Sequence, residues 1–200
     1  MNSPRTSTYA RARFGHYAAP LLFALCLCLT LPASAAVQRK REHLTPEEIE
    51  LIRDNQVLDA RTGVFIKAAE RRLLAVTNPA ESEKNAPKEK EKWGEVKGTP
   101  TQLFYDISKI LEEAVVNVDD VAEHNPESPL LRKSLYMLSE ATGRMLPALS
   151  KLRQDVTIEA EADQLDRALE TAREITNAAK ERGVTAEDLK VKAKAAKKNN

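Results

Sequence analysis

The chain has 200 residues, with 31 lysines and arginines against 30 aspartates and glutamates, so its formal net charge is only +1. This balance leaves no basic field to attract nucleic acid, and an aromatic content of 4% is low for a surface that stacks on bases. The apolar residues are mostly Leu, Ile, Val and Ala, and only six residues are glycine. This composition favours an all-α fold.

Residues 1–35 have the features of a secretory signal peptide. Arginines form a positive n-region, a short apolar run covers residues 18–29, and Ala33-Ser34-Ala35 is an A-x-A cleavage pattern. The run is shorter than the roughly 20 apolar residues that span a membrane. We therefore expect cleavage after Ala35 and export to the periplasm or the exterior. The alternative is an uncleaved segment that anchors the protein in the membrane.

Cleavage at this position would change the chemistry of the chain. It removes both cysteines and three arginines, so the remaining 165 residues carry 28 basic and 30 acidic side chains, a net charge of −2. A mature chain without cysteine has no disulfide, no thiolate nucleophile and no covalently attached haem. Its stability must come from a hydrophobic core, for which about 150 residues suffice.

A first helix is predicted at residues 46–76, after a short exposed leader at residues 36–45. Thr45-Pro46-Glu47-Glu48 combines an N-cap threonine, a proline at the first helical position and a glutamate at the third, which is the pattern of a capping box. Apolar residues recur at helical spacing from there. Asn78-Pro79 should end the helix, because proline disfavours helical geometry in the residue before it.

Residues 77–99 are predicted to form a charged, flexible linker. Glutamates and lysines alternate along the segment, and Pro79 and Pro87 interrupt it. Trp93 is its only large apolar residue. The tryptophan either packs on the outside of the helices or anchors a partner protein.

Three further helices are predicted between residues 100 and 182. Thr99-Pro100 and Ser128-Pro129 each pair an N-cap residue with proline, and each span carries a wide apolar stripe typical of core-facing helices. Their connections are short, which predicts antiparallel neighbours. Pro147 should kink or split the middle helix. The expected helices cover residues 100–124, 129–153 and 157–182.

A short helix and a lysine-rich tail are predicted at residues 183–200. The tail is interpreted either as a frayed, solubilising helix end or as a surface for anionic lipid or another polyanion. Polyanion binding of this kind should fall steeply with salt. The lysines in question are Lys190, Lys192, Lys194, Lys197 and Lys198.

The residues for metal, haem or hydrolytic chemistry are scarce. Asp120 and His124 lie one helical turn apart and are weak metal candidates, since two ligands are too few for a stable site. A haem ligand would have to be a residue such as Met145, which its spacing places in the core. The sequence has no G-x-S-x-G, H-E-x-x-H or glycine-rich phosphate motif. We predict no cofactor, no metal and no enzymatic activity.

Leu44-Thr45-Pro46-Glu47-Glu48 resembles the Leu-Thr-x-x-Gln motif of the Spy/CpxP family of periplasmic chaperones and stress sensors, with glutamate in place of the glutamine. The match covers five residues, has no second copy in the chain, and is equally explained by helix capping. The family folds as a cradle-like helical dimer that holds unfolded clients. The resemblance therefore implies a client-holding function.

Together these features predict an all-α protein with an antiparallel-type bundle of about four long helices. The leading hypothesis is an exported, non-enzymatic protein that acts through a protein partner or self-association, as an adaptor, scaffold or client-holding protein. The alanine-rich helix at residues 157–182 suits either internal packing or a coiled-coil seam between copies. The alternatives are a small-ligand or metal-binding bundle and a polyanion or membrane-surface binder that uses the lysine tail.

Overall fold

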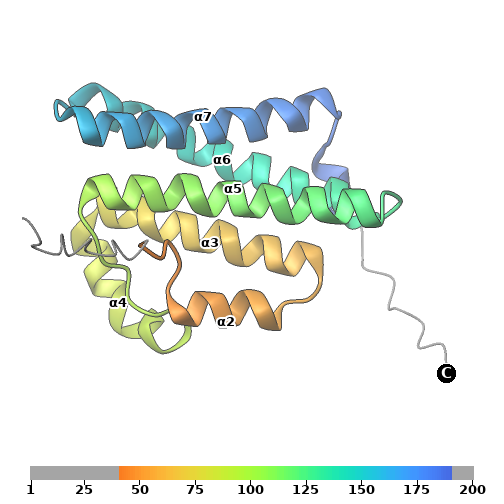
Figure 1. Ribbon diagram of the computed structural model, residues 1–200, viewed down its shortest axis with the longest axis horizontal. Coiled ribbons are helices and arrows are strands. Elements are labelled where there is room, and N and C mark those ends of the chain that lie inside the picture. The colour runs from red at the N-terminus through yellow and green to blue at the C-terminus, as the bar shows by residue number, and fades with distance from the viewer. Residues whose placement is uncertain (1–40, 191–200) are drawn as a thin grey trace, which may run out of the picture. The chain divides into compact units, whose positions relative to one another are not determined.

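The computed structural model describes residues 41–190, and within this range every regular element is helical (Figure 1). The prediction of an all-α fold is confirmed there. The predicted signal peptide, its cleavage site after Ala35 and the lysines beyond Lys190 lie outside the described residues. No helix in the described range is both long and apolar enough to cross a membrane.

Most of the predicted helix boundaries agree with the structure to within two residues. The helix at residues 100–124 is matched at both ends, since Thr99 forms the expected cap and Asn125 ends the helix. The helices are α2 (Pro46–Asp54), α3 (Leu58–Thr77), α4 (Pro79–Trp93), α5 (Pro100–His124), α6 (Leu130–Asp155) and α7 (Glu159–Glu181), followed by the 3-10 helix η1 (Ala186–Lys190).

The prediction of one continuous helix over residues 46–76 is wrong. The chain breaks between α2 and α3, where Asn55 caps α2. Both its backbone N–H and its side-chain amide donate to the carbonyl of Leu51, at 3.1 and 2.7 Å. Asparagine favours such turns because its side chain competes for backbone hydrogen bonds. The break reverses the direction of the chain, so that α2 and α3 lie side by side and run in opposite directions.

The prediction of a flexible linker at residues 77–99 is also wrong for its central part, which is helix α4. Asn78 ends α3 and also caps α4, because its side-chain oxygen accepts from the N–H of Glu81 at 3.2 Å. Pro79 then occupies the first turn, where its missing N–H costs nothing. No residue of α4 is buried, so its apolar pattern gave no helical signal.

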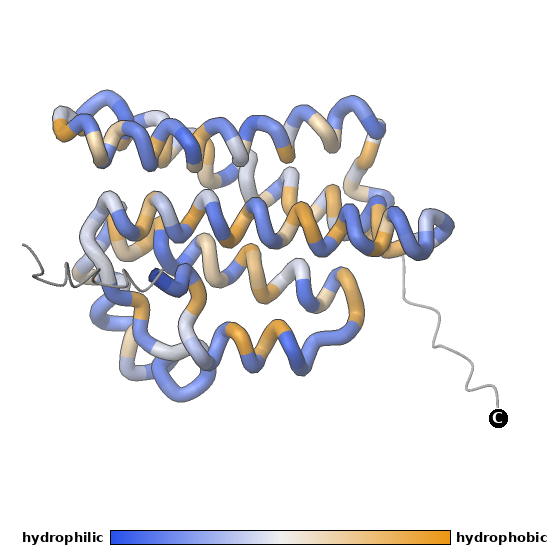
Figure 2. Tube along the Cα trace, viewed as in Figure 1, coloured by the Kyte–Doolittle hydropathy of each residue, from blue (hydrophilic) through white to orange (hydrophobic). Residues whose placement is uncertain are grey.

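The main core lies between α3, α5, α6 and α7. Both α5 and α6 pack against α3 and against α7, and Figure 2 shows hydrophobic residues recurring along all four helices. Figure 1 shows that α5 runs opposite to α3 and α6 and parallel to α7. Ala168 and Ala172 are fully buried, so this part of the alanine-rich helix serves internal packing.

Pro147 does not split its helix, since α6 continues from Leu130 to Asp155. Met145 and Leu149, on either side of the proline, are almost completely buried in the core. Packing on both sides therefore holds the helix together where one backbone hydrogen bond is missing.

A buried ionic cluster fixes α2 to α3. Glu48 is fully buried, and its Oε1 accepts from Nη1 of both Arg71 and Arg72, the former at 2.6 Å. The other carboxylate oxygen, Oε2, accepts from the N–H of Thr45 at 2.9 Å, which completes the predicted capping box. One carboxylate thus serves as a helix cap and as the partner of two buried guanidinium groups.

The two arginines also donate hydrogen bonds to backbone carbonyls just before α2 and at the end of α4. Arg72 Nη2 donates to the carbonyl of His43 at 2.9 Å, and Arg71 donates to the carbonyls of Trp93 and Gly94 at 3.0 and 2.6 Å. Gly94 has a φ of 68°, and a Cβ there would meet the Thr45 hydroxyl, so only glycine suits this close approach. The cluster therefore fixes the end of α4 as well.

Replacing Glu48 with Gln should strongly destabilise the protein. The substitution keeps the size of the side chain but leaves the buried guanidinium of Arg72 without a counter-charge and removes one of the two carboxylate partners of Arg71, and breaking a buried ion pair in this way typically costs about 3–5 kcal/mol. Glu50→Gln is the control, because its partner Arg53 and Glu50 itself are both exposed and such pairs contribute about 1 kcal/mol or less. Urea unfolding followed by the fluorescence of Trp93, the single tryptophan, measures both. If the two substitutions lowered the free energy of unfolding equally, the buried cluster would not make the large contribution that we assign to it.

The attachment of α4 should depend on pH through Glu89. Partial burial raises the pKa of Glu89, but the hydrogen bonds and charges of Lys67 and Arg71 outweigh it, so the pKa lies below its ordinary value of 4.5. A lowered folded-state pKa stabilises the fold above the unfolded-state pKa, and this contribution disappears as the pH falls through the folded-state value.

Glu89→Gln should therefore lower the free energy of unfolding by up to about 1 kcal/mol at pH 7, and the difference from the unmodified protein should shrink below about pH 4.5. The measurement is urea unfolding between pH 7 and pH 3. Glu91→Gln, an exposed change on the same helix, should show no such trend. A difference that grows on acidification would contradict the assigned ion pairs.

Candidate functional site

The metal and haem candidates do not converge on a site. Asp120 and His124 lie at the exposed end of α5, where His124 Nδ1 is 2.8 Å from the carbonyl of Asp120 and 3.4 Å from its carboxylate. Met145 is buried in the core. Within the described residues, no group of three or more His, Cys, Asp or Glu side chains is placed to hold a metal ion.

Trp93 is the last residue of α4 and is half-buried. Its ring centroid is 5.9 Å from the guanidinium carbon of Arg71 and from Nζ of Lys92, a cation–π arrangement. Its carbonyl accepts from the Thr45 hydroxyl at 2.7 Å. The residue thus joins α4 to α2 and α3. Lys190, the one tail lysine that the structure describes, pairs with Glu187 at 2.5 Å.

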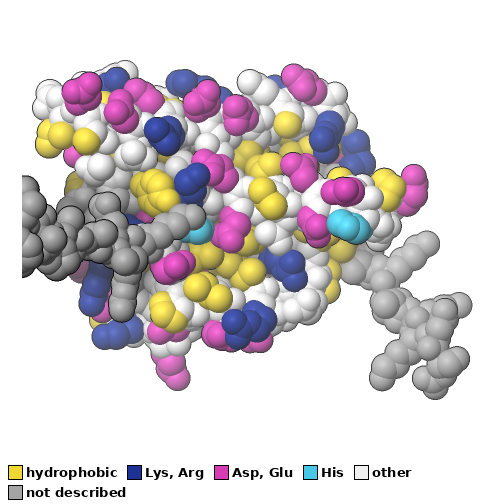
Figure 3. Space-filling view, viewed as in Figure 1, with side chains coloured by type: hydrophobic (Ala, Val, Ile, Leu, Met, Phe, Trp, Pro, Cys, Tyr) yellow, Lys and Arg dark blue, Asp and Glu magenta, His cyan; other side chains and the backbone are white. Residues whose placement is uncertain are grey.

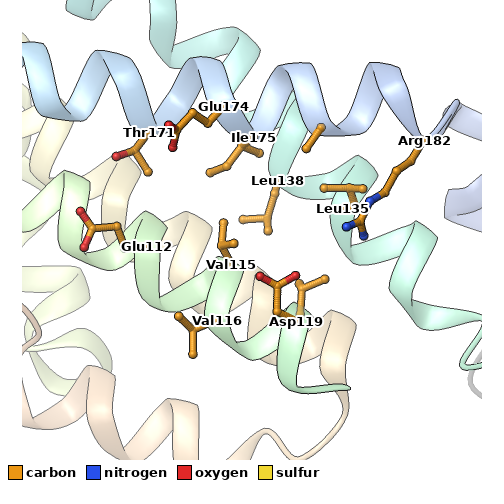
Figure 4. A pocket seen from close by; sticks show the side chains of 12 residues that line it. Glu112, Val115, Val116, Asp119, Leu135, Leu138, Thr171, Glu174, Ile175 and Arg182 are labelled. Atoms are coloured by element: carbon orange, nitrogen blue, oxygen red, sulfur yellow. The ribbon is translucent and has the colours of Figure 1, made fainter. Parts of the chain in front are cut away.

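A groove between α5 and α7, which we call the α5–α7 groove, is lined mostly by apolar surface and is partly open to solvent. Its volume is about 450 Å³, and α6 supplies its floor (Figure 4). The residues on α5 and α7 recur at intervals of three and four, so each helix presents one continuous stripe. The groove is lined by Glu112, Val115, Val116, Val118 and Asp119 of α5, Leu135 and Leu138 of α6, Thr171, Glu174, Ile175 and Ala178 of α7, and Arg182, the C-cap of α7.

The centre of the α5–α7 groove is apolar and partly open to solvent. Leu138 and Ile175 are buried at its base, and Val115 points toward them from α5 (Figure 4). Val116 lies beside Val115 but is 62% exposed, one of the two most exposed large hydrophobic residues in the described chain. The apolar surface therefore continues from the core out to the rim.

Charged side chains surround this apolar centre. Asp119 on α5 and Glu174 on α7 are exposed, and in the described part of the chain neither makes an ion pair. Glu112 is paired with Lys109 at 2.5 Å, and Arg182 lies at one end of the groove. Figure 3 shows hydrophobic side chains between α5 and α7 with acidic groups beside them.

The lining of the α5–α7 groove suits binding by apolar contact and charge. It contains no histidine or cysteine, and the one hydroxyl, that of Thr171, donates to the carbonyl of Arg167 at 3.0 Å. The groove was not predicted from the sequence, because a wide apolar stripe predicts a core-facing helix without showing where that core is open to solvent. The available signal was Val116, an apolar residue between the acidic residues Glu112 and Asp119.

The ionic cluster was missed for a different reason. Glu48 was identified as a capping residue, but Arg71 and Arg72 lie 23 and 24 positions further along the chain. Two adjacent arginines inside an apolar helical stripe indicate a buried partner without saying which. Comparison of the chain with protein-family models, curated proteins and solved structures finds no match.

Proposed function

We propose that this chain is an exported, non-enzymatic protein that acts by binding a protein partner in the α5–α7 groove. The scaffold for this function would be an antiparallel-type bundle of about four long helices. The observation that carries the proposal is the exposure of Val116 at the rim of an apolar groove whose base is the core itself. An apolar concave surface bordered by a few polar groups is the usual form of a binding site.

The shape of the groove supports a helical partner segment. It lies between α5 and α7, which run parallel, and a depression between two such helices accepts the side-chain ridge of a third. From Thr171 to Arg182 the groove follows α7 for about 16 Å, or three helical turns. A short amphipathic helix could bury three or four apolar side chains over this length.

The compartment in this proposal rests on residues 1–35, whose sequence has the features of a secretory signal peptide. An exported protein that binds an exposed apolar segment of another chain would act as an adaptor, a scaffold or a client-holding protein. The groove favours these functions because it offers a place for part of a partner while leaving the rest of that partner free.

A small apolar ligand is the second candidate occupant. A volume of about 450 Å³ falls in the range of about 300–1,000 Å³ that is typical of ligand sites. Native mass spectrometry of protein purified from its own compartment separates the two possibilities. A stoichiometric bound molecule of a few hundred daltons would favour the ligand.

The proposal predicts site-specific cross-linking at position 116. A photoreactive phenylalanine analogue at Val116 should give a discrete protein adduct in the producing cell, because this position would lie against the partner. Position 158 is the matched control, since Ile158 is 63% exposed, equal to Val116 within one percentage point, and lies outside the groove. The readout is the adduct mass by gel and mass spectrometry.

The substitution Val116→Asp should abolish the adduct from a photoreactive group placed at position 178, which lines the groove from α7, whereas Ile158→Asp should leave it intact. The added charge opposes burial against an apolar partner face and leaves the core untouched. Equal adducts at positions 116 and 158, or none at 116, would refute binding in the groove.

A further inference from the structure

We infer that the partner segment of the α5–α7 groove is a cationic amphipathic helix, with apolar residues on one face and lysine or arginine along its flanks. This inference rests on the proposed function and adds to it the charge of the partner. It follows from the position, exposure and pairing of the acidic side chains around the groove.

The two rims of the groove each carry a carboxylate that has no ion-pair partner among residues 41–190. Asp119 belongs to α5 and Glu174 to α7, so the two side chains flank the apolar centre from opposite sides (Figure 4). A helix that covers Val115 and Ile175 would partly remove both carboxylates from water. Such desolvation is unfavourable unless the incoming segment supplies a positive charge to each.

The other charged groups that line the groove do not pair with Asp119 or Glu174. Glu112 already has Lys109 at 2.5 Å. Arg182 is the one cation among the lining residues of the described chain, and its side chain extends over Leu135 at one end of the groove, where it forms no ion pair with Asp119 or Glu174 (Figure 4). A neutral partner would leave Asp119 and Glu174 unpaired, and an acidic partner would be repelled by them, so the rim selects against both.

The lysine tail of the chain itself is a poorer occupant than a separate partner. Between Lys190 and Lys198 its apolar residues are one valine and three alanines. These small side chains would fill little of a groove of about 450 Å³. The chemistry of the groove calls for a segment with large apolar residues as well as positive charge.

Two synthetic 18-residue peptides test the inference, one of leucine and lysine and one of leucine and glutamate, both with leucine on a single helical face. Fluorescence anisotropy with the purified full chain should show binding of the lysine peptide and a much weaker response to the glutamate peptide. Asp119→Lys combined with Glu174→Lys should weaken binding of the lysine peptide about tenfold, from the loss of two exposed charge pairs.

The control is Glu83→Lys combined with Glu91→Lys on α4, which changes the net charge by the same amount. Both control residues are exposed, and α4 packs against α2 and α3 only within the described fold. This control should leave the affinity unchanged, which separates the groove from general attraction to an acidic protein. Asp119→Asn combined with Glu174→Gln provides a milder second variant should the reversal disturb folding.

The outcomes separate the charge inference from the proposed function. Equal binding of both peptides that is lost in Val116→Asp would overturn the cationic partner and keep the groove. Failure of both peptides to bind would refute the groove as a helix-binding site. Tighter binding of the lysine peptide after removal of residues 191–200 would identify the tail as the occupant and overturn the assignment to a separate partner.

Discussion

The carboxylate of Glu48 is the interaction on which the first half of the fold depends. It is fully buried, it caps α2 through Thr45, and it forms ion pairs with Arg71 and Arg72 of α3. Other N–H groups of the two guanidinium groups donate to the backbone carbonyls of His43 before α2 and of Trp93 and Gly94 at the end of α4, and Arg71 Nε donates to Glu89. A buried ion cluster of this kind is weak support for net stability, but every element it binds must lie in one position for its donors to be satisfied.

The cluster also decides which side of the core remains open. It holds α2 and α4 against α3, and neither helix packs on α5, α6 or α7. Within the described chain, the seam between α5 and α7 therefore has no further helix above it. The two valines of α5 lie at this seam, where one contributes to the core and the next is exposed at the rim. The groove is thus a consequence of where the polar contacts place the additional helices.

The sequence predicted those parts of the fold that depend on local signals. The ends of α5 follow from Thr99-Pro100 and from Asn125-Pro126, because capping and proline geometry act within a few residues. The break at Asn55 and helix α4 were missed, since the first interrupts a good apolar pattern and the second has no buried face. The groove could not be predicted, because the exposure of Val116 depends on the distance between α5 and α7, which lie far apart in the chain.

The charges at the rim bear on self-association as well as on partner choice. If two copies met groove to groove about a twofold axis, Asp119 and Glu174 of one copy would approach the same carboxylates of the other, since a twofold interface pairs a surface with itself. Like charges that are brought together at an apolar contact repel each other and weaken the contact. Other protein surfaces use the same repulsion to prevent self-association. On the proposal that the groove binds a cationic helix, the same carboxylates would also oppose closing of the groove on a second copy, and a heterologous partner would be the better match for this surface.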